Sequence, residues 1–570
     1  MAGEFEVQGG NDAALFTLKV RRGEGMALLA MNWKDATPPD DFVGFAIEYQ
    51  EPGGTQFWPL NNRLNFTEDQ SQTQGKRQFS TLEAPIQKFR WVHFPFHAEL
   101  DGDFGYRVTP VFMNADDTLR YGEQQTASIA LGGDTYPGIL NVGFTRGFIS
   151  SQAFVDNYES AGDISELIPA NADAGLTFQP THPKKDEALP WMGFEARKGI
   201  LDLLDAANAD PAAQVRAIAY DLNEPEVVSR LQSLGARLQV IVDDSGSHHP
   251  DTSAESQAAS QLAAAGAAVK RQHVLGLQHN KVVVVDGPTV KAVVCGSTNF
   301  SWRGFFVQNN NAATLHGQTA VAAYATAFDE YWNHDQDPAT FEGTPSADWQ
   351  DLGLDGIDAQ VAFSPHSGGN AKLAEITDDI ENHTTSSLFY SFAFLYQTPS
   401  LETAMQTVSE KPGLFVYGIS DRHAGGIHLL DPGGNPEPVF PAALSANLPL
   451  PFSAEPSAAG GVRMHHKFAV IDFDQPTARV YFGSYNFSGA ADTANGENVL
   501  VVRDRKVAVS YMVEALRIFD HYSFRVAQST ATTAQQPMLL KKPPRQPGDT
   551  PWWQKNYTDP PKVRDRELFA

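Results

Sequence analysis

One short pattern occurs twice in this chain and limits the folds that the chain can adopt. The first copy, LQHNKVVVVDG, places His279 and Lys281 ahead of four consecutive valines, and the second, MHHKFAVIDFD, places His465 and Lys467 ahead of a similar apolar run. Such short apolar runs are typical of buried strands. Because residues two apart in a strand share a face, each His and its Lys should point the same way. We therefore expect two related strands, buried along their length, that open into a shared pocket at one end.

Further polar residues follow each copy at matching distances. Asp286 and Asp472 lie an odd number of positions beyond the lysines, so we expect them on the opposite face, tying each strand to the scaffold. The segments GSTNFS and GSYNFS come next and supply two matched pairs, Ser297 with Asn299 and Ser484 with Asn486. If two lobes pack about a pseudo-twofold axis, two His, two Lys, two Ser and two Asn converge on the shared pocket.

The remaining sequence divides into an all-β part and two α/β parts. The first part reads as short strands separated by turn signals, and the alternation of Phe45, Ile47 and Tyr49 with smaller or polar residues predicts a β-sandwich. Strands then alternate with helices, and the order starts again, which predicts an α/β fold of two duplicated lobes with mixed sheets flanked by helices. The Pro-rich end also contains Trp and Tyr, and we expect an extended strap docked on the lobes. The predicted boundaries are 1–135 for the sandwich, 136–345 and 356–525 for the lobes, and 526–570 for the strap.

The composition restricts the compartment and the partners. The formal net charge of −26 argues against a general nucleic-acid coat, whose affinity comes largely from Lys and Arg, although a small basic pocket can lie on an acidic protein. The single cysteine, Cys295, excludes an intrachain disulfide framework. No apolar stretch reaches the roughly 18 residues of a membrane span, and the first residues lack the pattern of a signal peptide. We expect a cytoplasmic protein, or one exported without an N-terminal signal.

The predicted pocket suits an anionic phosphodiester. Ammonium groups and amide donors can hold the non-bridging oxygens where charge builds up during phosphoryl transfer. Lys281 and Lys467 would supply the charge that Mg²⁺ supplies elsewhere, so we expect no metal and no other cofactor. The best rival as a metal ligand set is the histidine pair in SHHPD (247–251), which we interpret as a polar loop.

The two copies resemble the double HxKxxxxD and GSxN signature of the phospholipase D superfamily, over about residues 138–524. The sandwich resembles a fibronectin type III or immunoglobulin-like module by pattern only. The resemblance implies a phosphodiesterase in which one imidazole forms a phosphohistidine and the other is general acid and then base. It also implies an acidic residue shortly after GSxN that bonds a His ring. The second copy offers Glu497, and the first offers Asn310, with Asn311 as the alternative register.

We expect Glu497 to support His465 and Asn310 to support His279. A carboxylate raises the pKa of an imidazole and keeps it a proton donor, whereas an amide orients the ring without that effect. On this reasoning His279 is the nucleophile and His465 the general acid, an arrangement that resembles tyrosyl-DNA phosphodiesterases. The expected catalytic set also contains Lys281, Lys467, Asn299 and Asn486, and Ser297 and Ser484 join the two lysines in phosphate binding.

Three functions remain open from the sequence. The first is a phospholipase D that hydrolyses phospholipids or transfers the phosphatidyl group to an alcohol, and the second is a nuclease or nucleic-acid-end phosphodiesterase. The third is a non-catalytic binding protein. Two motifs in one chain favour the lipid enzyme, and the acidity counts against long nucleic acid. Expected partners are a phosphodiester substrate and a membrane surface, with the loops 352–356 and 440–456 as candidate contacts and the partner of the sandwich open.

Overall fold

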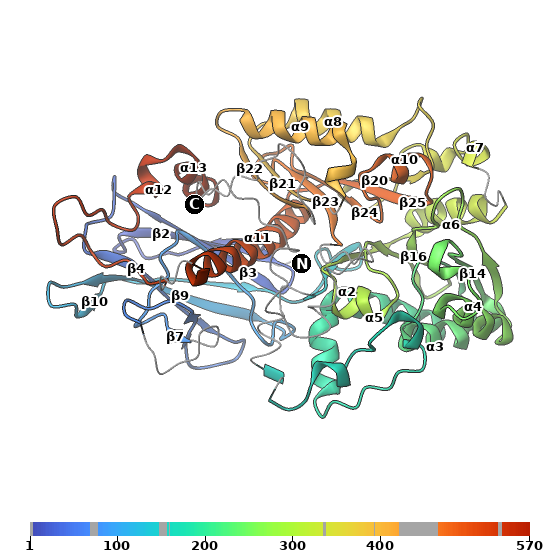
Figure 1. The fold of residues 1–570 in the computed structure, drawn as a ribbon, viewed down its shortest axis with the longest axis horizontal. Helices are drawn as coiled ribbons and strands as arrows, with labels where there is room; N and C mark the ends of the chain where they lie inside the picture. Colours follow the sequence, from blue (N-terminus) through green and yellow to red (C-terminus); the bar gives the residue numbers. More distant parts are fainter. Residues whose placement is uncertain are drawn as a thin grey trace. The chain divides into compact units, whose positions relative to one another are not determined.

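The computed structural model describes residues 4–68, 78–147, 157–158, 160–333, 338–392, 394–420, 465–533 and 538–570. These residues form two compact units (Figure 1). The first unit, which we call the sandwich unit, contains the described residues of 1–133 and 509–570. The second, the two-lobed unit, contains the described residues of 134–428 and 438–508. No helix among the described residues is long and apolar enough to cross a membrane.

Two antiparallel sheets make the sandwich unit, as the alternating sequence pattern predicts. The first sheet has the order β1 (Glu6–Gln8), β2 (Phe16–Gly23), β3 (Met26–Trp33) and β8 (Arg90–His93). The second has the order β10 (Leu119–Tyr121), β9 (Asp103–Met113), β4 (Phe42–Gln50) and β5 (Trp58–Pro59), with β11 (Gln125–Ala130) also on β9 and a separate pair, β6 (Asn61–Asn62) and β7 (Phe79–Ser80). Phe16 from one sheet and Phe45 from the other meet in one core, with ring centroids 5.1 Å apart.

The C-terminal strap packs on the sandwich, not on the lobes as we expected. Trp553 lies in the sandwich core, and the ring of Trp552 stacks on Phe89 with centroids 5.2 Å apart. The Nε1 of Trp552 donates to the Phe42 carbonyl at 3.0 Å. The strap contains two short helices, α12 (Lys555–Thr558) and α13 (Pro560–Phe569). Its aromatic rings dock here because the sandwich core offers them other aromatic rings to pack against.

The long helix α11 (Arg505–Thr533) also departs from the expected boundary at residue 525. From Val509 onwards it groups with the sandwich unit. Ser510 Oγ donates to Glu24 Oε1 at 2.7 Å, and both side chains are buried. Arg90 and Asp520 pair at 2.7 Å. From Val509 onwards this helix therefore belongs to the sandwich unit and not to the second lobe.

The two-lobed unit contains two seven-stranded mixed sheets of matching order, as predicted. Lobe 1 has the order β12 (Leu140–Phe144), β18 (Asn311–His316), β17 (Lys291–Gly296), β16 (Lys281–Asp286), β13 (Gln214–Ala219), β14 (Leu238–Val242) and β15 (Ala268–Arg271). Lobe 2 has the order β19 (Gln350–Asp351), β20 (Asp358–Ser364), β25 (Glu497–Arg503), β24 (Arg479–Gly483), β23 (Lys467–Ile471), β21 (Ser387–Phe392) and β22 (Phe415–Ser420). Six strands correspond, from β12 with β20 through β14 with β22, and in each lobe the strand of the HxK motif is central.

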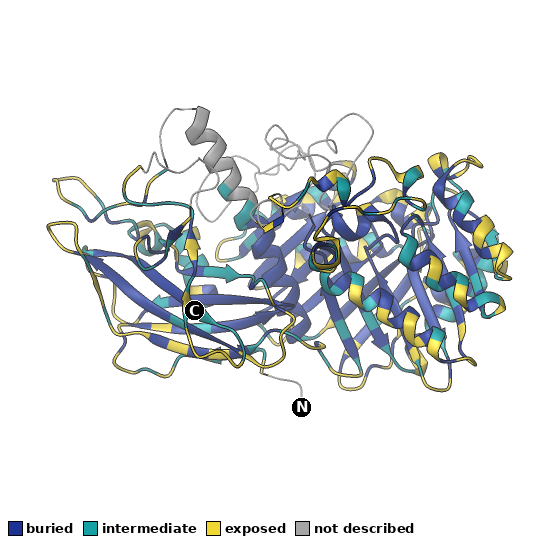
Figure 2. Cartoon of the chain, turned by 90° about the horizontal axis from the view of Figure 1, so that it is seen from below, coloured by how far each residue is buried: buried dark blue, intermediate teal, exposed yellow. Residues whose placement is uncertain are grey.

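Helices cover these sheets, and the strands between them are buried (Figure 2). The helices are α2 (Lys185–Ala209), α3 (Pro225–Leu234), α4 (Ala254–Ala264), α5 (Trp302–Phe306), α6 (Gln318–Asn333) and α7 (Pro338–Phe341) in the first half, and α8 (Lys372–His383), α9 (Pro399–Glu410) and α10 (Gly489–Thr493) in the second. Single 3₁₀ turns are η2 (Ile164–Glu166), η3 (Ala172–Ala174), η4 (Gly235–Arg237), η5 (Gly246–His248), η6 (Pro345–Ala347) and η7 (Leu395–Gln397). Helix α3 begins where Glu224 caps it and Pro225 fixes its first turn.

The apolar side chains of one candidate membrane loop are buried. Leu352 is fully buried and Leu354 is 6% exposed, so the loop 352–356 packs inward instead of offering apolar side chains to lipid. The other candidate, 440–456, lies outside the described residues.

Candidate active site

The two HxK strands bring their histidines together. Strands β16 and β23 are buried along nearly their whole length, and each begins at the lysine of its motif. His279 and His465 precede these strands, are 4% and 6% exposed, and have ring centroids 6.2 Å apart. Residues that are 186 positions apart in sequence thus form one site between the lobes.

The supporting residues are crossed between the lobes, opposite to our expectation. Nδ1 of His465 lies 2.8 Å from Oδ1 of Asn310, a lobe 1 residue. Nδ1 of His279 lies 3.2 Å from Oε2 of Glu497, a lobe 2 residue. The expected pairs, Glu497 with His465 and Asn310 with His279, are wrong.

Backbone pairing between the lobes explains the crossing. The His279 amide donates to the Gly496 carbonyl at 2.8 Å, and the Gly496 amide donates to the Leu277 carbonyl, also at 2.8 Å. The start of β25 therefore runs beside the segment that precedes β16. Glu497 follows Gly496 directly, so its carboxylate reaches the ring of the other lobe.

The residues between each His and Lys, Asn280 and His466, also contact the opposite lobe. Asn498 Nδ2 donates to Asn280 Oδ1 at 2.7 Å, and Asn311 Nδ2 lies 3.4 Å from His466 Nδ1. All four side chains are fully buried. Asn311, our alternative support in lobe 1, thus contacts the neighbour of His465 and not the catalytic ring.

Hydrogen bonds fix the tautomer of His465. Asn310 Nδ2 donates to the Gly304 carbonyl at 2.9 Å, which leaves Asn310 Oδ1 as the acceptor. The same His465 Nδ1 lies 3.1 Å from the Ser297 carbonyl, which can only accept. Nδ1 therefore carries a hydrogen, and Nε2 is the nitrogen with a free lone pair when the ring is neutral.

Two asparagines hold the side chain of Glu497 beside His279 through three hydrogen bonds. Its oxygens accept from the Asn486 amide at 3.1 Å, from Asn495 Nδ2 at 2.9 Å and from Asn486 Nδ2 at 3.5 Å. The side chain is fully buried. A carboxylate in this place favours Nδ1–H on His279, so Nε2 again has the free lone pair.

Both imidazoles have lowered pKa values, so the expected rise for His465 is wrong. Burial lowers the pKa of His279 to about 4, with help from Lys281 and against Glu497. Burial, then Lys467 and Lys281, hold the pKa of His465 well below its usual value. The crossing removes the carboxylate from His465, and nearby ammonium groups disfavour a second positive charge.

The two lysines are fully buried and each bonds back to its own motif. Lys281 Nζ donates to the His279 carbonyl and lies 4.8 Å from the centroid of Tyr220. Lys467 Nζ donates to the His465 carbonyl at 2.8 Å. Burial lowers the pKa of Lys281 to about 7 and the pKa of Lys467 well below its usual value.

The glycine of each GSxN motif permits a close backbone approach. Gly296 and Gly483 have φ of 138° and 145°, and a Cβ would lie 2.5 Å from the Asn311 carbonyl and 2.3 Å from the Asn498 carbonyl. Only glycine fits there. The turn that follows carries Ser and Asn back toward the histidines.

The two serines have partners inside the protein, which differs from the expected phosphate-binding role. Ser297 Oγ donates to Asn310 Oδ1 at 2.9 Å and accepts from the Asn311 amide at 3.0 Å. Ser484 Oγ accepts from the Asn498 amide at 2.9 Å. Both are fully buried. These hydroxyls fix the segment that supports the histidines.

The two motif aspartates have different surroundings. Asp472 is fully buried and accepts from the backbone amides of Thr385, Ser386 and Ser387, which ties β23 to the start of β21 as expected. Asp286 is 38% exposed and pairs with Lys291 across the β16–β17 hairpin. The scaffold role holds for Asp472 and not for Asp286.

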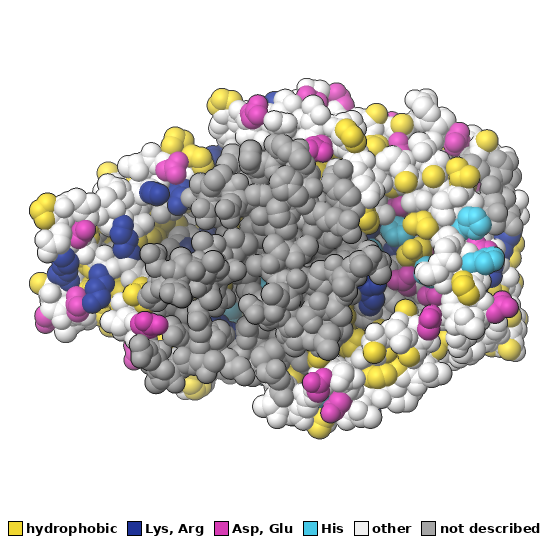
Figure 3. Space-filling view, viewed as in Figure 1, with side chains coloured by type: hydrophobic (Ala, Val, Ile, Leu, Met, Phe, Trp, Pro, Cys, Tyr) yellow, Lys and Arg dark blue, Asp and Glu magenta, His cyan; other side chains and the backbone are white. Residues whose placement is uncertain are grey.

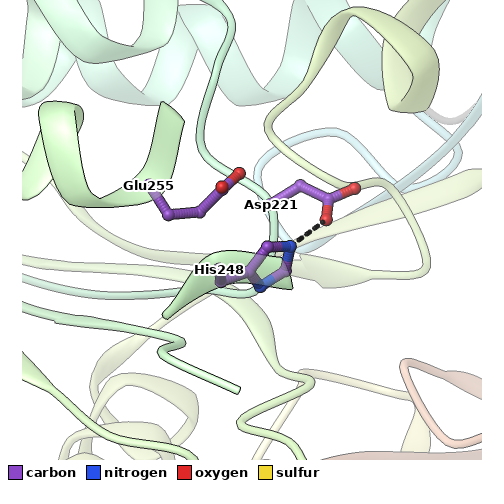
Figure 4. Close-up of side chains that lie close together, drawn as sticks. All are labelled: Asp221, His248 and Glu255. Carbon is purple, nitrogen blue, oxygen red and sulfur yellow. Dashed lines mark ion pairs between the residues drawn. The ribbon is translucent and has the colours of Figure 1, made fainter. Parts of the chain in front are cut away.

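Sequence reasoning missed a group next to the site in lobe 1. Asn299 Nδ2 donates to Asp221 Oδ2 at 2.7 Å, and Asp221 pairs with His248 (Figure 4). The Tyr220 ring lies between His248 and His279, with centroids 4.6 and 4.7 Å away. The signal was an Asp directly after an apolar strand, in AIAYDLN, beside the strand of the HxK motif. His248 belongs to the SHHPD segment that we interpreted as a polar loop.

On the described part of the face in Figure 3, histidine and acidic side chains lie beside one another at the surface. In the two-lobed unit, His273 and Asp244 form a partly exposed pair, with Nδ1 and Oδ1 2.6 Å apart. Asp221, His248 and Glu255 form the one group of three potential ligands found among the described residues, with ligand atoms all within 4.8 Å of one another.

Comparison with known proteins agrees with the motifs. Residues 200–332 and 442–519 match the family described as "Cardiolipin synthase, PLD-like domain". The chain is 44% identical over 48 residues to a phospholipase D of Rickettsia felis and 42% identical over 48 residues to that of Rickettsia conorii. Each match covers 8% of this chain and 22% of the relative, so the chain spans about a fifth of these relatives' length.

Solved structures show more distant likenesses. Nuc of Salmonella typhimurium, a phospholipase D family member, is 22% identical with a TM-score of 0.21, over 24% of this chain and 88% of Nuc. A phosphatidylserine synthase of Haemophilus influenzae is 14% identical with a TM-score of 0.39, over 66% of this chain and 93% of that one. The two segments that match the family contain both HxK motifs, so over these residues the chain is similar to phospholipase D-like proteins.

Proposed function

We propose that this chain is a phosphodiesterase that hydrolyses phospholipids, or transfers their phosphatidyl group to an alcohol, through a phosphohistidine. The observation that carries the proposal is the pair of histidines from two lobes, each with Nδ1 beside an acceptor and each next to a buried lysine. Two basic nitrogens on either side of one phosphorus are what an in-line double displacement needs.

His279 is the nucleophile in this proposal, for a reason opposite to the one drawn from the sequence. Its Nε2 bonds to phosphorus while the bond from phosphorus to the leaving oxygen breaks, and protonated His465 gives that oxygen a proton. The ring of His279 then carries positive charge, which the Glu497 carboxylate compensates at 3.2 Å. The neutral amide of Asn310 orients His465 without holding its proton back.

The second half reverses the proton transfer. Neutral His465 takes a proton from water or an alcohol, whose oxygen bonds to phosphorus as the bond to His279 breaks. A bound anionic phosphodiester raises the pKa of His465 from its low value, since an opposite charge favours the imidazolium. Lys281, Lys467, Asn299 and Asn486 hold the non-bridging oxygens. The Lys charges do this without a metal.

The substrate class rests on two supports. Both motifs lie in one chain, and the curated relatives that match it are named phospholipase D. An enzyme acting on nucleic acid, or a binding protein, is the alternative that the experiment must separate.

The deciding experiment is a product assay with wild type and His279→Ala, without added metal. Phosphatidylcholine plus ethanol, single-stranded DNA and RNA are supplied in parallel. Choline and phosphatidylethanol from the wild type alone are the expected result. Cleaved nucleic acid with intact lipid would overturn the lipid substrate, and a folded protein that turns over none of these would overturn the enzyme.

A further inference from the structure

A chain of ionisable groups leads away from the lobe 1 half of the site. Asp243 Oδ2 lies 2.7 Å from His248 Nδ1, and His248 Nε2 lies 3.2 Å from Asp221 Oδ1. The second oxygen of Asp221 accepts from Asn299 Nδ2 at 2.7 Å. Asp243 is fully buried, and its Oδ1 accepts from the Gln278 amide, next to His279, at 2.7 Å. This network of side chains therefore ends at the side-chain amide of Asn299, which belongs to the first GSxN motif.

At neutral pH, His248 in this network is protonated and Asp221 is ionised. Burial opposes a charge on His248, but hydrogen bonds to Asp221 and Asp243 outweigh it and raise the pKa of His248 to about 10. Burial likewise opposes a charge on Asp221, yet His248 and the positive charges nearby lower its pKa. The other charged or titratable groups that face these two are Asp243, Glu255, Lys281, Arg303, Tyr220 and Arg271.

In lobe 2 a different carboxylate faces the motif asparagine. Ala219 pairs with Lys281 and Phe392 pairs with Lys467, so the lobe 2 position that corresponds to Asp221 is Phe394. The asparagine of the second GSxN motif instead points Nδ2 at Glu497, at 3.5 Å. Each motif asparagine thus faces a carboxylate, but only lobe 1 uses one that is separate from the histidine support.

We propose that Asp221, held by His248, is a positioning residue for Asn299 that keeps one amide hydrogen of this side chain turned to the substrate phosphate. An amide nitrogen carries two hydrogens, so one serves Asp221 and the other remains for a phosphate oxygen. The inference rests on the proposed function and extends it to a group outside the shared motif.

A bound cation is the competing interpretation of Asp221, His248 and Glu255 (Figure 4). Both imidazole nitrogens of His248 already face carboxylates, one at 2.7 Å and one at 3.2 Å. Glu255 Oε1 accepts from the Leu222 amide at 3.1 Å. The ring therefore acts as the cation of this cluster, and a metal would have to displace its proton.

A double-mutant cycle tests the inference on the full chain with bis(p-nitrophenyl) phosphate. Asp221→Asn is isosteric, and we expect kcat to fall about 10- to 100-fold through loss of alignment. In the Asn299→Ala background the same change should have no further effect, since the group it positions is gone. Equal losses in both backgrounds would overturn the inference.

The pH profile supplies the second readout, with each variant's rate divided by the wild-type rate at the same pH. In His248→Gln, burial is left to raise the pKa of Asp221, so the ratio should fall as pH is lowered from about 8 to about 5. Asp221→Asn has no such group and should give a flat ratio. His273→Gln, which breaks another His–Asp pair of lobe 1, is the matched control and should stay near one. A flat ratio for His248→Gln would contradict the inference.

Two further measurements distinguish failure of the proposed function from failure of this inference. If the wild type turns over no phosphodiester, the proposed function fails, and the same cycle is measured on sulfate affinity by calorimetry. Coupling between positions 221 and 299 would then support the inference, and additivity would overturn it. Loss of wild-type activity in EDTA, restored by Zn²⁺ or Mn²⁺ and absent in Asp221→Asn, would show a metal site and overturn it as well.

Discussion

The two lobes share a sheet order and a motif, yet their charged side chains differ. Lobe 1 has an amide after GSxN and a separate carboxylate, Asp221, on its motif asparagine. Lobe 2 has Glu497, which faces both Asn486 and the histidine of lobe 1. A duplicated scaffold thus gives two histidines nearly equivalent positions and different electrostatic partners. In the proposed mechanism, therefore, the supporting residues and not the strands assign different roles to the two histidines.

Removing one histidine at a time should have the largest effect on activity and should distinguish the two lobes. His279→Ala should lose about 10⁴-fold or more in kcat, because no phosphohistidine can form. His465→Ala should still react with bis(p-nitrophenyl) phosphate, whose leaving group needs no proton, and should accumulate a covalent adduct on His279. Mass spectrometry of the quenched protein checks this. An adduct on His465 in His279→Ala would reverse the assignment.

Exchanging the residues that support the two histidines should test whether these supports decide the roles of the rings. Glu497→Gln removes the charge that compensates the His279 ring, and we expect a loss of about 10²- to 10³-fold in kcat. Asn310→Asp places a carboxylate behind His465 and raises its pKa. The double variant Glu497→Gln with Asn310→Asp should move the covalent adduct toward His465, as read by peptide mapping. An adduct that stays on His279 alone would show that the supports do not decide the roles.

The pH dependence of kcat/KM for bis(p-nitrophenyl) phosphate, whose leaving group needs no proton from His465, should follow two lowered pKa values. His279 is neutral above its pKa of about 4, so the acidic limb should lie well below the usual value of about 6.5 for histidine. Lys281 loses its charge above its pKa of about 7, which should produce the alkaline limb. Lys281→Arg keeps the charge and should move that limb upward, whereas Lys291→Arg on the surface should not. An alkaline limb unchanged in Lys281→Arg would assign it to another group.

The motif aspartates should show the smallest contrast. Asp472→Asn removes the charge from a buried acceptor of three backbone amides and replaces its second oxygen by an NH2 donor, which should lower the free energy of unfolding by about 2–4 kcal/mol. Asp286→Asn removes a half-exposed ion pair, which contributes about 0–1 kcal/mol. Urea denaturation of both variants checks this. Equal losses would mean that Asp286 also supports its strand.

The sequence was sufficient for the strands and insufficient for their mutual packing. A period of two placed His279 with Lys281 on one face, and the repeated order of elements predicted both lobes. The spacing between GSxN and Glu497 is a property of one lobe. The histidine that Glu497 contacts, however, depends on how the two lobes pack together. Asp221 has no fixed spacing to the motif, so it was recognisable only through the contact with Asn299. The strap showed its aromatic rings but not the surface that receives them.

The crossed supports also bear on how the protein is made. During translation lobe 1 leaves the ribosome first, carrying His279 without the carboxylate that faces it in the folded protein. That carboxylate, at position 497, is synthesised more than 200 residues later. A nascent or truncated chain that ends before it would hold an assembled lobe with an unsupported ring. If the proposed roles hold, a chain would gain activity only after both halves of the duplication have been synthesised and joined.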